Sequence, residues 1–353
     1  MKIILYTYDI VKIGGIETSF FLLSQYLTKS GYDVSVRYSR ADPMRVKRYK
    51  DFGIDIRPME KESCDILIIG SIYMIPNLIH AKVMVRQIHA NWSDDYWWKQ
   101  KAGIIRMLQV ADNTADMFLP VSKSSASFVS QYVTKPVQVM YNLAPEKTAI
   151  KRTLGDKLVI ASFTRMTGEK GLKNYEKLRD KLKALKIDAE LRVYTNGEAP
   201  SGWNKHEPVP DIRTELTDVD FVASLADTES FGYTIAEANS CGIPCIIKRT
   251  NGTKEFFDDV SNIILDDVDN LTKKQLTIKR KVTYNLPTIT KQSIDETMKE
   301  LKRLASKKCI IRSVRAFKDM EAKKMRSTGE IFAVSKERAK QLLNNDIKVA
   351  EKL

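Results

Sequence analysis

Short, nearly continuous apolar runs alternate with amphipathic segments along most of the chain. The runs lie at residues 2–8, 33–38, 64–69, 82–86, 158–163, 191–194, 220–225 and 245–247. Runs of this length, bounded by turn residues, are typical of buried parallel strands. The segment 18–30 has apolar residues at helical spacing, and Gly31 follows it as a helix terminator. The pattern predicts strands joined by helices, as in a parallel α/β protein.

The length of 353 residues predicts two domains of ordinary size with a small addition. Residues 137–142 are predicted as the last strand of the first domain, and a polar, proline-bearing stretch follows them. We therefore expect domains at residues 1–145 and 146–305. A helix rich in Lys and Glu, from about residue 288 to residue 304, closes the second.

Residues 306–353 differ from the two domains in their pattern. They predict a strand, a turn, a strand, a helix capped by Ser335 and a final strand, which together form a small α+β module. The segment carries 13 Lys and Arg against 6 Asp and Glu, about half of the net charge of +14 for the whole chain. Such a surplus points to an anionic partner, which could be nucleic acid, an anionic membrane surface or a phosphate-rich polymer.

Composition narrows the class of protein further. Hydrophobic residues make up 43% of the chain, yet no run approaches the roughly 20 apolar residues of a membrane-spanning helix. The apolar start is too short for a secretory signal because Asp9 interrupts it, so we expect a cytoplasmic protein. The four cysteines lack the spacing of a zinc site or a disulfide framework, and we expect reduced core thiols.

One stretch places two carboxylates around a glycine. Glu229 and Glu237 flank Gly232, and apolar runs precede and follow them, which predicts a strand, a loop, a helix and a strand. The first N–H groups of a helix that begins at Gly232 have no intrahelical partner, so an anion or a hydroxyl can bind there. Carboxylates accept hydrogen bonds from hydroxyls, so the pair is a candidate site for a sugar or ribose. Two solvated helix carboxylates are the alternative.

This stretch resembles the Glu-x7-Glu signature of the family 4 glycosyltransferases, including the Cys-Gly-Ile-Pro segment at 241–244. The resemblance implies the GT-B fold, in which two Rossmann-like domains face a cleft. It implies transfer of a hexose from a nucleotide sugar, such as UDP-glucose, with retention at the anomeric carbon. It also implies that Glu229 contacts the transferred sugar and Glu237 the ribose. The same segment supplies further donor-binding candidates: Ser230, Phe231, Gly232, Tyr233 and Thr234.

A basic loop follows the predicted strand 158–163. Arg165 and Lys170 lie five residues apart across a glycine-containing turn, so both can converge on phosphate oxygens. In the resembling family this Arg-x4-Lys loop neutralises the diphosphate leaving group, which implies catalysis without a metal or other cofactor. Two exposed basic residues are the alternative. Tyr194 ends the next predicted strand, where family loops line the nucleotide base.

An Asp-x-Asp sequence, the metal-diphosphate motif of another glycosyltransferase fold, occurs at residues 218–220. Because an apolar run follows Asp220 directly, we interpret this residue as a carboxylate at the start of a strand. We predict no essential metal.

The first domain contributes a glycine pair and a histidine. Gly14 and Gly15 follow the first predicted strand and let the backbone approach a ligand closely, although the dinucleotide fingerprint is absent. His89 follows the predicted strand 82–86, where side chains of open α/β sheets face the ligand crevice. The resemblance implies that the glycines border the donor diphosphate and the acceptor, and that His89 lies beside the donor sugar. A plain turn and a hydrogen-bonded loop histidine are the alternatives.

Aromatic residues cluster directly after His89. Trp92, Tyr96 and Trp97 are candidates for binding the acceptor, because aromatic faces stack on sugars and bases. A membrane-interface element or a domain-packing element would have the same composition.

The module resembles a small domain that recurs in bacteriophage proteins, through Phe-x-Asp at residues 317–319 and Gly-x-x-Phe-x-Val at residues 329–334. This resemblance implies a phage or prophage source. Together with the basic surplus, it leads to the hypothesis that the acceptor is DNA carrying a modified base. A cell-wall polymer or a membrane glycolipid, with peripheral membrane contact, is the alternative acceptor. Two other classes stay open, as does the oligomeric state: a catalytically inert nucleic-acid-binding protein and a sugar-nucleotide epimerase.

Overall fold

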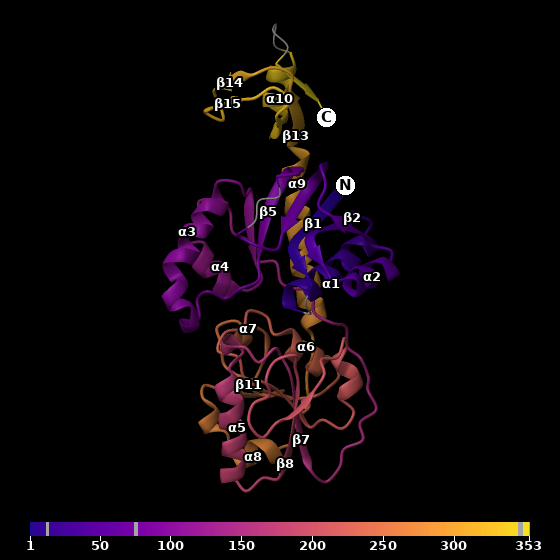
Figure 1. Cartoon of the computed structure of the whole chain (residues 1–353), viewed down its shortest axis with the longest axis vertical. Helices are drawn as coiled ribbons and strands as arrows, with labels where there is room; N and C mark the ends of the chain where they lie inside the picture. The colour runs from indigo at the N-terminus through magenta and orange to yellow at the C-terminus, as the bar shows by residue number, and fades with distance from the viewer. Residues whose placement is uncertain (12–13, 74–76, 345–348, 353) are drawn as a thin grey trace.

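The computed structural model describes residues 1–11, 14–73, 77–344 and 349–352. They form three parts along the long axis of the molecule (Figure 1). A small module lies at one end, an N-terminal unit in the middle and a second unit at the other end. Each large unit is built on a six-stranded parallel sheet, so the predicted α/β class is confirmed.

The N-terminal unit holds the sheet with strand order β3-β2-β1-β4-β5-β6. Its strands are β1 (Lys2–Ile10), β2 (Asp33–Ala41), β3 (Asp55–Pro58), β4 (Glu62–Ile69), β5 (Ile79–Ile88) and β6 (Met117–Pro120). Its helices are α1 (Gly15–Lys29), α2 (Pro43–Asp51), the 3-10 helix η1 (Asp95–Gln100), α3 (Lys101–Asp112) and α4 (Lys123–Val129). Both faces are buried, as expected for a parallel sheet. In β1, Ile3 and Leu5 pack with Phe20 of α1, whereas Ile4 and Tyr6 pack on the opposite face.

The second unit holds the sheet with strand order β12-β11-β10-β7-β8-β9. Its strands are β7 (Leu158–Phe163), β8 (Ala189–Tyr194), β9 (Asn204–His206), β10 (Phe221–Ser224), β11 (Cys245–Lys248) and β12 (Ile263–Leu265). Its α-helices are α5 (Leu172–Ala184), α6 (Tyr233–Ser240), α7 (Thr253–Phe256) and α8 (Lys273–Thr277). Three 3-10 helices accompany them, η2 (Gly168–Lys170), η3 (Ile212–Glu215) and η4 (Val268–Asn270). Counted from its own first strand, each sheet has the order 3-2-1-4-5-6 of a Rossmann-like domain.

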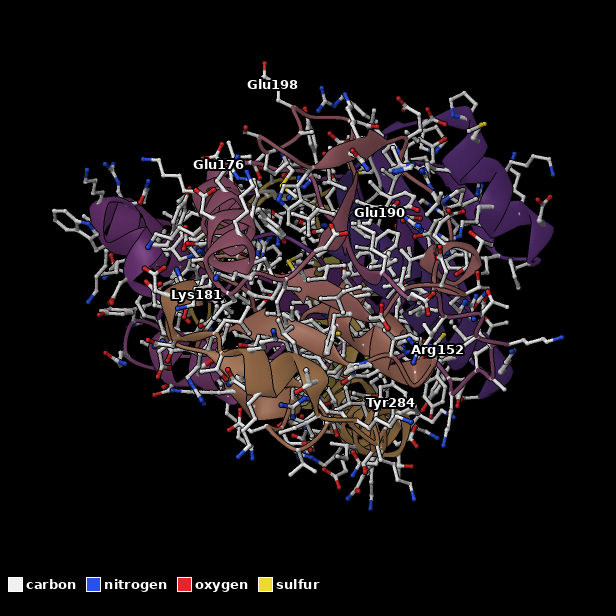
Figure 2. The ribbon with its side chains drawn as sticks, turned by 90° about the horizontal axis from the view of Figure 1, so that it is seen from below. Arg152, Glu176, Lys181, Glu190, Glu198 and Tyr284 are labelled. Atoms are coloured by element: carbon white, nitrogen blue, oxygen red, sulfur yellow. The ribbon has the colours of Figure 1, made fainter. Side chains whose placement is uncertain are left out.

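The helices α6 and α7 lie on the side of the second unit that faces the N-terminal unit (Figure 1). Figure 2 views the second unit from below, where Glu198 projects outward and Glu176 lies on α5.

A long helix, α9 (Leu286–Ser306), ties the parts together. Leu286 at its start packs in the core of the second unit, whereas Ile294, Met298 and Leu301 pack in the core that contains β1 and α1. Figure 1 shows α9 running along the N-terminal unit towards the module. The helix predicted at residues 288–304 is confirmed, and its packing gives the two units a shared element.

The small C-terminal module is also confirmed. Its strands are β13 (Lys308–Ser313), β14 (Phe317–Asp319), β15 (Lys324–Arg326), β16 (Ile331–Ser335) and β17 (Ala350–Lys352), with one helix, α10 (Lys336–Leu343). The Ser335 hydroxyl caps α10 by accepting the Arg338 N–H at 3.0 Å, as the sequence predicts. Asp319, which is 1% exposed, accepts hydrogen bonds from Arg326 and Arg338. β13 and β16 lie against β5 of the N-terminal unit.

The strand predicted at residues 137–142 is wrong in its extent. Only Val137 forms a bridge, with Phe118. The N–H groups of Gln138 and Met140 do donate to carbonyls of β6, but Pro120 has no N–H to return to the carbonyl of Gln138. The segment is therefore extended beside β6 without continuing the sheet.

The four cysteines are free thiols, of which Cys64, Cys241 and Cys245 are buried and Cys309 is half-buried. Within the described residues, no helix is long and apolar enough to cross a membrane.

Candidate functional site

The candidate site lies where loops of the two units meet. The loop after β5 in the N-terminal unit is hydrogen-bonded to the loops after β10 and β11 in the second unit. Carboxyl ends of parallel strands are where α/β proteins bind ligands, and here two such ends face each other. Most of the predicted site residues lie on these loops or on α6.

Glu229 and Lys170 form the central ion pair of the site. The Lys170 Nζ donates to Glu229 Oε2 at 2.9 Å, and the Ser230 N–H donates to Glu229 Oε1 at 3.0 Å. Burial alone would raise the pKa of Glu229, but the Lys170 charge and the N–H groups of Ser230 and Phe231 lower it overall. Glu229 is thus held as a carboxylate.

Two glycines set this geometry. A Cβ on Gly252 would lie 2.1 Å from the carbonyl oxygen of Glu229, so only glycine lets the loop after β11 pack on Glu229. Gly171 has φ +74°, and a Cβ there would lie 2.2 Å from the carbonyl oxygen of Leu225. The backbone around the Lys170–Glu229 pair is therefore closely fitted.

Arg165 lies in the same loop as Lys170 but faces a different carboxylate. Its side chain is 56% exposed, and its Nη2 lies 3.7 Å from Glu169 Oε1. The next residue, Met166, has φ +50°, which is strained for a non-glycine residue, and its side chain is buried in the core. Burial of Met166 fixes the loop, while Arg165 stays free to turn towards a ligand.

Glu237 lies on α6, so it follows Gly232 along the chain, whereas Glu229 precedes it. Burial, with a smaller contribution from the Asp211 charge, raises the pKa of Glu237 to about 7, although Arg213 and Arg48 oppose this shift. Arg48 belongs to α2 of the N-terminal unit, so charges from both units act on this carboxyl. Glu237 therefore changes its charge near neutral pH.

Gly232 precedes α6 with φ +83°, in the left-handed region that favours glycine. The ring of Tyr233, the next residue, lies near Gly15 of the N-terminal unit: a Cβ added to Gly15 would be 3.9 Å from it. The Thr234 hydroxyl donates to the carbonyl of Phe163 at 3.2 Å, and Phe231 is buried. Gly14 is the residue directly before α1 in the N-terminal unit.

His89 lies at the end of β5 with its ring beside Phe20, at 6.0 Å between ring centroids. Among the described residues, neither buried ring nitrogen has a hydrogen-bond partner. Burial lowers the pKa of His89 to about 3, so the imidazole is neutral. The hydroxyl of Ser230 donates to the carbonyl of His89, which brings this loop next to Glu229.

Polar residues outside the predicted set also connect the two units. Asp94, 7% exposed, accepts from the Thr228 hydroxyl at 2.8 Å and the Asn251 N–H at 3.0 Å. Glu255 accepts from the Lys123 N–H at the start of α4 at 2.8 Å and from the Tyr141 hydroxyl at 2.7 Å. The Glu-x7-Glu motif could not predict these contacts, because each contact joins two residues that lie more than 100 positions apart.

The predicted acceptor residues occupy different environments. Trp92 is 8% exposed and packs with Phe128 in the core, whereas Tyr96 and Trp97 pack edge to face at 5.1 Å. The Trp97 Nε1–H donates to the Thr228 hydroxyl at 3.1 Å across the two units.

Tyr194 is stacked between Phe163, at 4.5 Å, and His206, at 4.9 Å between ring centroids. Its hydroxyl donates to Glu215 at 3.1 Å. The ring is thus engaged on both faces, and only its edge is available to a nucleotide base.

The Asp-x-Asp residues have structural partners. Asp220 accepts the Val159 N–H at 2.8 Å, at the start of β10 as predicted, and Asp218 pairs with Arg192 at 2.8 Å. In the described part of the chain, no three His, Cys, Asp or Glu side chains gather as a metal ion would require.

The structure has the GT-B fold, with two Rossmann-like units around a cleft, as comparison with solved structures shows. HepE from Anabaena, solved in complex with UDP-glucose, is similar at a TM-score of 0.65 and 15% identity, over 87% of this chain and 99% of that chain. TarM from S. aureus, solved as a variant with Fondaparinux, alpha-GlcNAc-glycerol and UDP, is similar at a TM-score of 0.62 and 10% identity, over 86% and 98%.

Sucrose-phosphate synthase from Thermosynechococcus elongatus is similar at a TM-score of 0.60 and 10% identity, over 86% of this chain and 96% of that chain. No family model and no curated protein matches the sequence. At these identities the comparisons show the fold alone.

Proposed function

We propose that this chain is a glycosyltransferase of the family 4 type. It transfers a hexose from a nucleotide sugar, such as UDP-glucose, with retention and without a metal. The observation that carries the proposal is the Lys170–Glu229 pair at 2.9 Å, beside the start of α6 and opposite the loops of the N-terminal unit. The complexes of HepE with UDP-glucose and of TarM with UDP support a uridine donor.

The leaving diphosphate gains negative charge as the bond to the sugar breaks. Lys170, Arg165 and the first N–H groups of α6 would stabilise this charge, because preorganised donors act where charge develops. Arg165 is exposed and would turn from Glu169 towards the phosphates. These groups supply the positive charge that a metal provides elsewhere.

The remaining candidates would hold the donor in place. Glu229 would accept hydrogen bonds from hydroxyls of the transferred sugar, and Glu237 would accept those of the ribose. A neutral His89 can donate from one ring nitrogen and accept at the other, which suits a hydroxyl beside the reacting carbon. The contacts between the units would exclude water, which otherwise hydrolyses the donor.

Thermal stabilisation by nucleotides tests the proposal. The panel is UDP, UDP-glucose, UDP-N-acetylglucosamine, GDP-mannose and NAD, applied to the full chain and to Glu237→Ala. We expect UDP-sugars to raise Tm selectively, since a ligand that binds only the folded state stabilises it. The rise should be lost in Glu237→Ala. A protein that responds to none of these ligands would overturn the transferase proposal and favour the inert nucleic-acid-binding class.

The acceptor is the finer part of the proposal. The charge of +14 favours an anionic polymer, so DNA carrying a modified base is one candidate acceptor. A glycan of a wall polymer or membrane lipid, reached by peripheral contact in the cytoplasm, is the alternative. The net charge acts over the whole surface of the protein. The side chains next to the candidate site are therefore needed to choose between the two acceptors.

A further inference from the structure

A pocket of about 240 Å³ lies in the N-terminal unit next to the candidate site. Four aromatic side chains line it: Trp92, Trp97, Trp98 and Phe128. Polar and charged side chains complete the lining: Ser93, Asp94, Asp95, Lys101, Ser124, Ser127 and Gln131. The walls therefore come from the loop after β5, from η1 and from the adjoining helices α3 and α4.

Two residues of the lining connect the pocket to the candidate donor site. The Trp97 Nε1–H donates to the Thr228 hydroxyl at 3.1 Å, and this hydroxyl donates to Asp94 at 2.8 Å. Thr228 directly precedes Glu229, which is paired with Lys170. A ligand in the pocket would thus lie beside the residues proposed to hold the transferred sugar.

The lining matches a sugar ring better than a phosphate. Aromatic faces bury the apolar faces of a pyranose, while hydroxyl, amide and carboxylate groups bond its hydroxyls. The charged lining residues are two carboxylates, Asp94 and Asp95, and one amine, Lys101, so the pocket has no surplus of positive charge for phosphate. Its volume is below the range of about 300–1,000 Å³ typical of drug-sized ligands, which suits one ring.

We propose that this pocket binds a sugar ring of the acceptor, so that the acceptor is a glycan and not the phosphate backbone of DNA. The inference rests on the proposed transferase function and names the substrate class of its second site. Trp98 is 70% exposed and lies in the lining, so it offers an aromatic face that no core packing requires.

Tryptophan fluorescence tests the inference directly. Three of the four tryptophans line the pocket, and the fourth, Trp203, is 6% exposed in the second unit beside Tyr175. The probes are methyl glycosides of glucose, galactose, mannose and N-acetylglucosamine, and a duplex DNA oligonucleotide. We expect a saturable fluorescence change with at least one glycoside, and at least about tenfold weaker binding in Trp98→Ala, as loss of a stacking face predicts.

Phe52→Ala is the matched control, because Phe52 is 63% exposed and lies outside the pocket. No saturable change with any glycoside, or equal affinity in Trp98→Ala and the wild type, overturns the inference. A DNA-induced change that Trp98→Ala abolishes also overturns it. Stabilisation by UDP is measured in the same wild-type samples. A UDP response without glycoside binding leaves the transferase proposal standing, whereas glycoside binding without a UDP response contradicts the transferase proposal.

Discussion

The two large units share one strand order but bring different polar groups to the candidate site. In the second unit, Glu229 is paired with Lys170 and held by backbone N–H groups. In the N-terminal unit, both ring nitrogens of His89, Nδ2 of Asn91 and Oε2 of Glu17 are buried without a partner among the described residues. In the second unit, Oγ of Ser162 and the hydroxyl of Tyr233 are likewise buried without a partner among the described residues. Both units therefore hold unsatisfied polar groups, and the second unit adds the Lys170–Glu229 ion pair to the site.

The Lys170–Glu229 pair sets the two sides of the candidate site apart. A buried polar group without a partner costs free energy, so several such groups near one cleft indicate a site that a ligand completes. The Lys170–Glu229 pair is in place without a ligand, as the proposed stabilisation of a leaving group would require. We therefore expect the Lys170–Glu229 pair to be the preorganised part of the site, and the unpaired polar groups of both units to be the part that a ligand would satisfy.

The largest expected effect comes from breaking the ion pair between Lys170 and Glu229. Lys170→Ala removes the ammonium from Glu229, and we expect turnover of UDP-glucose, measured as released UDP, to fall by about 100-fold or more. Lys173→Ala is the control, because Lys173 lies three residues further along, at the start of α5, and is exposed. Equal loss in both variants would show that the pair has no special role.

The fit of the backbone around Glu229 gives the next effect. In Gly252→Ala the new Cβ meets the Glu229 carbonyl, so we expect unfolding free energy to fall by about 1–3 kcal/mol, measured by urea denaturation. Gly103 in α3 has nothing within 4 Å of its Cβ position, and Gly103→Ala should stabilise by about 0.5–1 kcal/mol. A Gly252→Ala variant as stable as the wild type would contradict the close fit of the backbone around Glu229.

The smallest expected effect concerns pH. Burial raises the pKa of Glu237 to about 7, so the folded protein keeps a proton that the unfolded chain, with a pKa near 4.5, releases. The stability that this proton contributes is present below pH 4.5 and is lost as pH rises towards 7. Glu237→Gln cannot ionise, so its Tm should fall less than that of the wild type between pH 5 and pH 8.

The same titration affects the donor. If the ribose binds the carboxylate, UDP affinity of the wild type should rise by about tenfold from pH 6 to pH 8, as the ionised fraction does. In Glu237→Gln the affinity should be flat, and in the control Glu176→Gln it should follow the wild type. A pH dependence that survives in Glu237→Gln would assign it to another group.

The sequence by itself determined the two parallel sheets, because buried strands of both units are continuous apolar runs. β7 was predicted at its observed bounds, residues 158–163, and β10 and β11 within a residue or two. Short elements such as α2 and β9 escaped prediction because they are polar and have little apolar periodicity of their own. Local sequence also predicted the Ser335 cap and the start of α6 at Gly232, since both depend on neighbouring residues.

The tertiary structure alone decided how the candidate site is closed. The bonds of Asp94 to Thr228 and Asn251, and of Glu255 to the start of α4, join residues more than 100 positions apart, and no local pattern encodes them. The pKa of Glu237 depends on burial and on Arg48 from the other unit. The spacing of residues in the sequence indicates which side chains could lie close together. The burial of these side chains and the distances between them are set only when the two units pack together.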